Sequence, residues 1–183
     1  MVEAASFIRK MFEEGIRMRE KFGADNVFDF SLGNPDVSPP PAVKDTLLEL
    51  INDTKVTHGY MPNSGYPQVR QAVADYLNQE FGTQLTPDLI VMTVGAAGAL
   101  NDCLKALINP GEEILTPAPY FVGYNQYAFV AGATLVTAPT KPDFHLDLEA
   151  IQTGITEKTR VVLINSPNNP TGAVYSAEEL DGL

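Results

Sequence analysis

The segment from Asn165 to Gly172 reads NSPNNPTG and groups three asparagine side chains with two prolines and a glycine. The prolines and the glycine rule out continued regular structure, so we expect a turn here. Val161 to Ile164 precede it, and this short, β-branched run favours a buried strand. A helix should restart at Ser176, whose hydroxyl can cap it while Glu179 completes a capping box. The turn therefore lies at the carboxyl end of a strand, where open α/β sheets bind their ligands.

A second candidate ligand site is the segment from Gly95 to Gly98, which lies between an expected strand, Leu89 to Val94, and a helix through Ile108. Small residues let a ligand approach the backbone, and the free N–H groups of a first helical turn attract anions. Such a turn could bind a phosphate, although close packing of strand and helix is the alternative explanation. It lacks the spacing of a dinucleotide fingerprint and the lysine of a P-loop, which disfavours nucleotide binding.

Three further residues have ordinary structural explanations when they are taken alone. Phe121 follows an expected strand at Glu113 to Thr116 and is a natural core residue. Tyr60 lies in a loop and could be a half-buried tyrosine whose hydroxyl contacts water. Gly33 belongs to a turn before a proline-rich segment, where glycine is common.

The elements that would position these residues alternate along the second half of the chain. Expected strands at 89–94, 113–116, 134–137 and 161–164 are separated by helical patterns. This alternation implies parallel pairing with right-handed crossovers and a layered α/β/α domain. Helices are also expected at Ala4 to Phe22, around Val43 to Ile51, and from Pro67 onward.

Composition limits the classes of partner. The chain has 183 residues and a net charge of −11, which argues against nucleic acid because phosphate binding needs clustered Lys and Arg. No basic amphipathic segment favours a membrane surface, and the apolar runs are far below the ~18 residues of a membrane-spanning helix. Cys103 cannot form an intramolecular disulfide, so we expect a buried thiol and a cytoplasmic protein.

An isolated Asn-Pro pair would indicate only a strand-to-helix connection, but NSPNNPTG closely resembles the signature turn of class I/II aminotransferases. These are enzymes of the pyridoxal-phosphate (PLP) fold type I group, similar to aspartate aminotransferase. Matching segments follow in family order from Gly33 to Gly172. The resemblance implies an incomplete three-layer α/β/α large domain at 51–183 with a mainly parallel sheet. Residues 1–50 would form an N-terminal segment of the small domain and a linker.

The resemblance assigns the cofactor phosphate to the backbone N–H groups of Ala96 and Ala97. Many relatives add a Ser, Thr, Lys or Gln side chain in this turn, and this chain has none there. Tyr60, in the segment YMPNSGYPQVR, matches the tyrosine that reaches the phosphate of the neighbouring subunit. This match implies a homodimer with shared active sites.

The resemblance also assigns the cofactor ring and the substrate. Phe121 matches the aromatic ring that stacks on the pyridine, and Asn169 matches the amide that donates to the pyridine 3-oxygen. Gly33 matches the glycine near the substrate carboxylate. Together these matches imply PLP as cofactor and amino acids and 2-oxo acids as substrates.

No catalytic residue of the family is matched in this chain. PLP chemistry needs a Schiff-base lysine and a carboxylate beside the pyridine nitrogen. In the family both follow the NPTG turn, so we expect them beyond Leu183. Seven lysines are present, and each is most simply a surface charge: Lys10, Lys21, Lys44, Lys55, Lys105, Lys141 and Lys158. The chain is therefore expected to supply half an active site and to be inactive alone.

The family strand order gives a second reason to expect a partial domain. With strands numbered along the chain, the order in space is 3-2-4-5-6-7-1. The strands at 134–137, 113–116 and 161–164 can therefore pair, whereas 89–94 is separated from them. Exposed edges of such strands are an aggregation hazard, so we expect poor stability unless further sequence or another copy fills the gap.

The leading hypothesis is an aminotransferase that moves an amino group between an amino acid and a 2-oxo acid. A PLP-dependent C–S lyase or decarboxylase would share every motif seen here. A truncated paralogue that serves as an interaction module is the non-enzyme alternative. Substrate identity and reaction direction cannot be inferred from these motifs.

Overall fold

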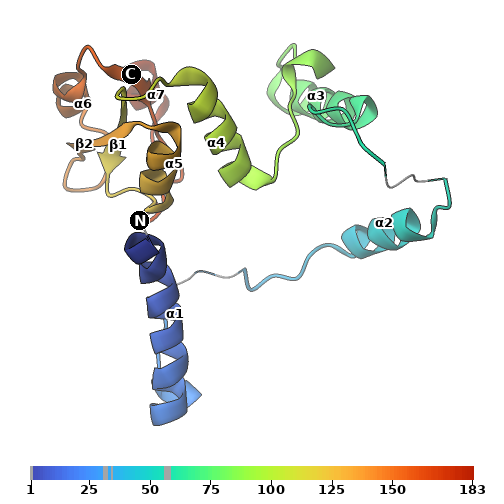
Figure 1. The fold of residues 1–183 in the computed structure, drawn as a ribbon, viewed down its shortest axis with the longest axis horizontal. Coiled ribbons are helices and arrows are strands. Elements are labelled where there is room, and N and C mark those ends of the chain that lie inside the picture. The colour runs from blue at the N-terminus through green and yellow to red at the C-terminus, as the bar shows by residue number, and fades with distance from the viewer. Residues whose placement is uncertain (1, 31–32, 34, 56–58) are drawn as a thin grey trace. The chain divides into compact units, whose positions relative to one another are not determined.

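The computed structural model describes residues 2–30, 33, 35–55 and 59–183, and it describes side chains from residue 10 onward. The chain forms two compact units, Met1–Tyr60 and Met61–Leu183 (Figure 1). Within the described residues, no helix combines the length and the apolar character that crossing a membrane requires.

The first unit consists of two long helices and a connecting segment. Helix α1 spans Val2–Phe22 and ends where the Gly23 N–H donates to the Arg19 carbonyl at 2.9 Å. A 3₁₀ turn, η1, covers Ala24–Asn26, and helix α2 covers Pro41–Asn52 with a proline at its first position. Both helices match the sequence predictions.

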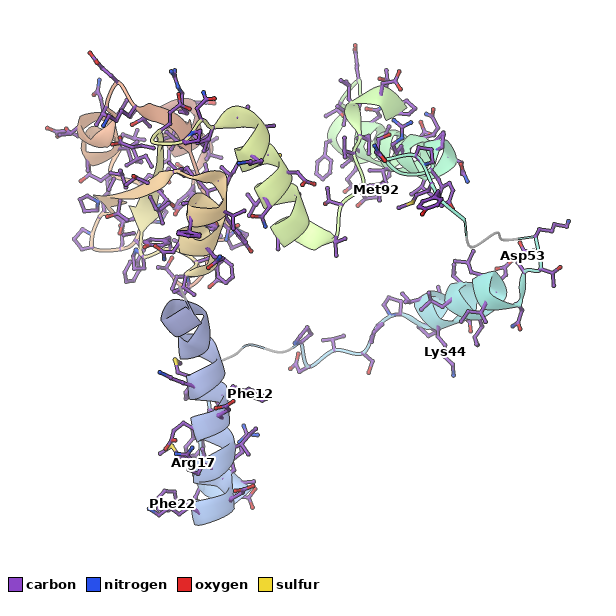
Figure 2. The ribbon with its side chains drawn as sticks, viewed as in Figure 1. Phe12, Arg17, Phe22, Lys44, Asp53 and Met92 are labelled. Atoms are coloured by element: carbon purple, nitrogen blue, oxygen red, sulfur yellow. The ribbon has the colours of Figure 1, made fainter. Side chains whose placement is uncertain are left out.

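The apolar side chains of this first unit are largely exposed. Phe12 and Phe22 project from α1 (Figure 2), with 49% and 51% of their surface accessible, and Ile51 on α2 is 77% exposed. Among the residues of this unit whose burial is described, only Gly15, which has no side chain, is buried. None of the apolar side chains described in this unit is buried.

The second unit is built on a parallel three-stranded sheet. Strand β1 spans Glu113–Ala118, β2 spans Thr134–Pro139 and β3 spans Thr159–Val162, in the order β2-β1-β3. Both pairings of β1 are parallel. This order confirms the prediction that the third, second and fourth expected strands pair.

Successive residues of β1 point to opposite faces of the sheet, and each face has its own core. Ile114 packs with residues of helices α4 and α5 on one face, and Leu115 packs with Ile151 of helix α6 on the other. Figure 1 shows α5 and α6 on opposite sides of the sheet. The domain is thus a three-layer α/β/α arrangement, as the alternation of elements predicts.

The helices of this unit follow the predicted pattern. Helix α3 spans Pro67–Phe81, α4 spans Gly95–Leu107, α5 spans Gly123–Ala131, α6 spans Leu148–Gly154 and α7 spans Ala177–Asp181. The prediction of a buried Cys103 is wrong, because this thiol is exposed. Its neighbour Leu104, 2% exposed, is the residue that α4 contributes to the core.

The expected strand at Leu89–Val94 does not form a ladder. Leu89 ends a 3₁₀ turn, η2, at Pro87–Leu89, and residues 90–94 have no strand partner among the described residues. Ile90 is nevertheless extended, and the Met92 N–H donates to the Ser64 carbonyl at 3.0 Å. The segment has strand-like residues but no neighbouring strand, which is what the expected strand order implies.

The prediction of a buried strand at Val161–Ile164 is only partly right. Strand β3 begins two residues earlier, and Val162 is 37% exposed because β3 is an edge strand. The ladder ends early for a chemical reason. The Leu163 N–H donates to the Leu115 carbonyl at 2.8 Å, but Pro117 has no N–H to return to the Leu163 carbonyl. The Thr116 hydroxyl donates to that carbonyl instead, at 2.8 Å.

Candidate active site

Asn168 organises the turn that follows β3. It is 8% exposed, and its Nδ2 donates to the Thr171 hydroxyl at 2.9 Å. Its backbone N–H donates to the Ala173 carbonyl at 2.8 Å, and its own carbonyl accepts from the Gly172 N–H at 2.7 Å. Because side chain and backbone are both bonded, the turn from Asn168 to Ala173 has one defined conformation.

The neighbouring Asn169 is exposed, and its carboxamide has no hydrogen-bond partner among the described residues. The peptide bond that follows it, Asn169–Pro170, is cis. Asn168 therefore supports the turn, while the Asn169 carboxamide presents its N–H donors and its oxygen acceptor at the surface of the turn.

The aromatic segment after β1 is also held in place. The Phe121 ring is half-buried and meets the buried Tyr124 ring edge to face, with 5.7 Å between centroids. A Cβ at Gly123 would lie 2.3 Å from the Phe121 ring, so only glycine lets the ring occupy this position. On the other side of the cluster, Tyr120 stacks parallel to Tyr124 at 6.2 Å.

Among the described residues, a single hydrogen bond joins these two turns. Asn168 Nδ2 donates to the Pro119 carbonyl at 3.1 Å, two residues before Phe121. Since β1 and β3 are adjacent and parallel, their carboxyl ends lie side by side, and both turns begin there. The structure thus brings the segments that carry Phe121 and Asn169 together.

The first turn of α4 is open to ligands. Ala96 and Ala97 are exposed, and among the described residues their N–H groups have no acceptor. No atom lies within 4 Å of the position that a Cβ on Gly95 would take. Helix α4 packs on α5, whose first residues follow Phe121.

The remaining two predicted residues belong to the first unit. Gly33 is exposed with no atom within 4 Å of its Cβ position, and its neighbours Leu32 and Asn34 lie outside the described residues. Tyr60 is fully exposed.

All seven lysines are exposed, which confirms the prediction that each is a surface charge. The described residues also contain no group of three or more His, Cys, Asp or Glu side chains that could hold a metal ion.

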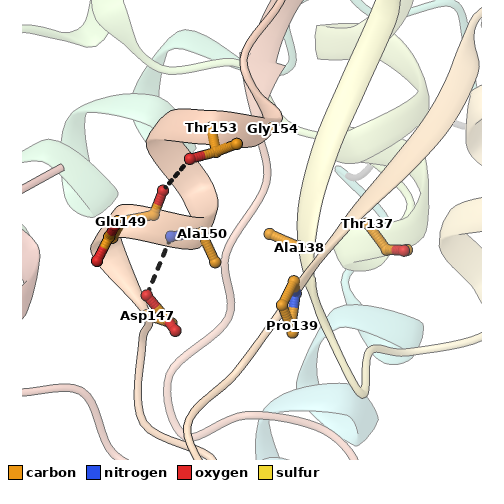
Figure 3. Close-up of a pocket in the computed structure, with 8 residues that line it drawn as sticks. All are labelled: Thr137, Ala138, Pro139, Asp147, Glu149, Ala150, Thr153 and Gly154. Atoms are coloured by element: carbon orange, nitrogen blue, oxygen red, sulfur yellow. Dashed lines mark hydrogen bonds between the residues drawn. The ribbon is translucent and has the colours of Figure 1, made fainter.

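A hollow of about 460 Å³ lies between α6 and the end of β2, but it contains none of the predicted site residues (Figure 3). Its polar groups already serve the helix, because Asp147 caps α6 through the Ala150 N–H at 3.0 Å. The Thr153 hydroxyl likewise donates to the Glu149 carbonyl at 2.8 Å.

Glu179 anchors the helix that follows the Asn-rich turn. The predicted capping box between Ser176 and Glu179 is present. Glu179 also accepts from the Leu146 N–H at 2.8 Å and pairs with His145 Nδ1 at 3.0 Å. The Ser176 N–H and then His145 lower the pKa of Glu179 to about 2, and the bond to Glu179 raises the pKa of His145.

This anchor should depend on pH. The stability that protonated His145 contributes to this anchor is fully present below pH 6.5, and it is lost as the pH rises through the raised pKa of His145. The Glu179 contribution is complete above pH 4.5 and is lost as pH falls through about 2. We therefore expect α7 to be held most firmly between pH 4.5 and 6.5. An NMR titration of the His145 ring should give a pKa above 6.5 that falls in Glu179→Gln. An unchanged midpoint in that variant would contradict the assignment.

Sequence reasoning missed the role of Asn168. It assigned the cofactor contact to Asn169 and treated the other asparagines as turn residues. The adjacent pair Asn168-Asn169 was the available signal, because two neighbouring carboxamides were present and only Asn169 had been given a role.

Comparisons with known proteins agree with the resemblance. The family model described as aminotransferase class I and II matches residues 25–183. A probable aspartate/prephenate aminotransferase of Aquifex aeolicus is 37% identical over 157 residues, which cover 85% of this chain and 39% of the relative. The aspartate/prephenate aminotransferase of Thermus thermophilus is 37% identical over 153 residues, 82% of this chain and 39% of that protein. The chain therefore spans about two fifths of the length of these relatives.

Solved structures share the fold. An aminotransferase from Eubacterium rectale superposes with a TM-score of 0.90 at 42% identity, over 96% of this chain and 45% of that one. The Thermus thermophilus aspartate aminotransferase with maleate superposes with a TM-score of 0.83 at 32% identity, over 96% of this chain and 45% of that one. These matches confirm the predicted fold class and the family resemblance.

Proposed function

Because the chain belongs to the class I and II aminotransferases, we propose that the protein transfers an amino group between an amino acid and a 2-oxo acid with PLP as cofactor. The observation that carries the proposal is the Asn168–Pro119 hydrogen bond, which holds the turn of Asn169 beside the turn of Phe121. L-Aspartate is the first amino donor to test, since the named relatives include aspartate/prephenate aminotransferases.

The predicted cofactor-binding groups fit PLP. The open N–H groups of Ala96 and Ala97 suit a phosphate at a helix N-terminus. The half-buried Phe121 ring offers a face for the pyridine, and the exposed Asn169 carboxamide can donate to a ring oxygen. When bound, PLP supplies an electron sink, while these residues bind and orient it.

Two further assignments are part of the proposal. Tyr60, fully exposed, donates its hydroxyl to the phosphate in a second subunit, so the active form is a homodimer. Gly33, with open space around its Cα, lies near the substrate carboxylate. None of the seven exposed lysines serves as the covalent attachment point for PLP.

The test combines binding, turnover and covalent trapping. Purified protein is titrated with PLP, then supplied with L-aspartate and 2-oxoglutarate, and glutamate is measured by mass spectrometry. A matched aliquot is reduced with borohydride and digested, and peptide mapping then locates any lysine that carries PLP. We expect PLP binding, and we expect Asn169→Ala to weaken it by about tenfold, on the order of one lost hydrogen bond.

Each readout can overturn a separate part of the proposal. Absence of PLP binding would refute the cofactor assignment. Carbon dioxide release from L-aspartate without glutamate would favour the decarboxylase alternative, and sulfide release from L-cysteine in a parallel sample would favour the C–S lyase alternative. A borohydride-fixed adduct on one of the seven lysines would refute the statement that none of them is the attachment point.

A further inference from the structure

We propose that Asn168 is a positioning residue for the candidate active site, acting through the two turns that carry Phe121 and Asn169. The inference rests on the proposed function for its ligand, but its geometry stands apart from any ligand. Asn168 is one of two buried polar residues in the described chain, the other being Thr116.

No second hydrogen bond links the two turns among the described residues. The ladder between β1 and β3 stops at Leu163 because Pro117 cannot donate. Beyond that point, among the described residues, the Asn168 donation to the Pro119 carbonyl is the hydrogen bond that joins the segment after β1 to the segment after β3. Removing it separates the turns while leaving the strands paired.

Asn168 uses both of its carboxamide donor hydrogens. One Nδ2 hydrogen goes to the Pro119 carbonyl at 3.1 Å and the other to the Thr171 hydroxyl at 2.9 Å. That hydroxyl in turn accepts from the Ala173 N–H at 3.2 Å. The carboxamide therefore fixes the inner side of the turn, and the next residue, Asn169, is left pointing to the surface.

Thr116 supplies a matched control. Its hydroxyl makes a part-buried bond from β1 to the Leu163 carbonyl at 2.8 Å, and this bond lies at the end of the β1–β3 ladder, before either turn begins. Thr116→Val and Asn168→Leu each remove one buried side-chain donor between the same two chain segments. They differ in whether the lost bond lies at the candidate site.

The experiment uses the protein as isolated, with and without PLP. Hydrogen exchange by mass spectrometry follows peptides covering 119–124 and 165–173, and a PLP titration gives Kd. We expect Asn168→Leu to speed exchange in both peptides without PLP and to weaken PLP binding by about tenfold, on the order of one buried hydrogen bond. Thr116→Val should leave both turns and the PLP affinity unchanged. If Asn168→Leu does not fold, Asn168→Ala is measured in the same way.

The outcomes separate this inference from the proposed function. Unchanged exchange in both turns would overturn the positioning role, whether or not PLP binds. Faster exchange with an unaltered Kd would show that Asn168 only supports the fold, which also overturns it. If the wild-type protein fails to bind PLP, the proposed function fails, and exchange of the two turns alone decides whether Asn168 holds them together.

Discussion

Leu115→Ala is expected to lower the free energy of unfolding by about 2–5 kcal/mol, the range for a leucine removed from a packed core. Leu115 is fully buried on the central strand and packs with Leu146, Ile151 and Tyr175. Gly154 approaches it closely, since a Cβ there would lie 3.1 Å from Leu115 Cδ1. Leu115 shares its core cluster with Ala138 of β2 and Ile151 of α6, so the cavity left by truncation should not collapse easily.

Urea unfolding monitored by circular dichroism measures this effect, with Leu107→Ala as the control. Leu107 ends α4 and is 62% exposed, so its truncation should change stability by no more than about 0.5 kcal/mol. Equal losses in the two variants would mean that Leu115 is not at the centre of the core. Because folded proteins are stable by only about 5–15 kcal/mol, the Leu115 change should also reduce the yield of folded protein.

Gly65→Ala is expected to have the second large effect. Gly65 has φ of +96°, and a Cβ there would lie 2.5 Å from Met92 Cγ and 2.8 Å from Met92 Cβ. The backbone strain should cost about 1–3 kcal/mol. The overlap with Met92 should add about 1–3 kcal/mol, as overpacking does elsewhere. Thermal unfolding and exchange of the Met92 amide, which donates to the Ser64 carbonyl, measure the loss.

Gly82→Ala separates these two causes. Gly82 also has a positive φ, +65°, but no atom lies within 4 Å of its Cβ position. Only the left-handed backbone is then penalised, at about 1–2 kcal/mol. If the two alanine variants lost the same stability, contact with Met92 would not be the reason that position 65 is glycine.

The sequence by itself predicted most of the local structure. Helix ends followed from short-range chemistry, as at Pro67 and in the capping box of Ser176 and Glu179. Parallel pairing followed from the alternation of elements, and the strand order followed from the family resemblance. The candidate cofactor-binding groups, namely Asn169, Phe121 and the first turn of α4, could be predicted because each lies in a short motif of a few consecutive residues.

Contacts between distant segments were decided only by the tertiary structure. Whether Cys103 or Leu104 faces the core depends on where α5 packs, and whether residues 90–94 form a strand depends on a neighbour elsewhere in the chain. The division of labour between Asn168 and Asn169 is also tertiary. Two adjacent carboxamides have the same chemistry, and only the Pro119 carbonyl, 49 residues away in sequence, makes one of them a support and leaves the other free.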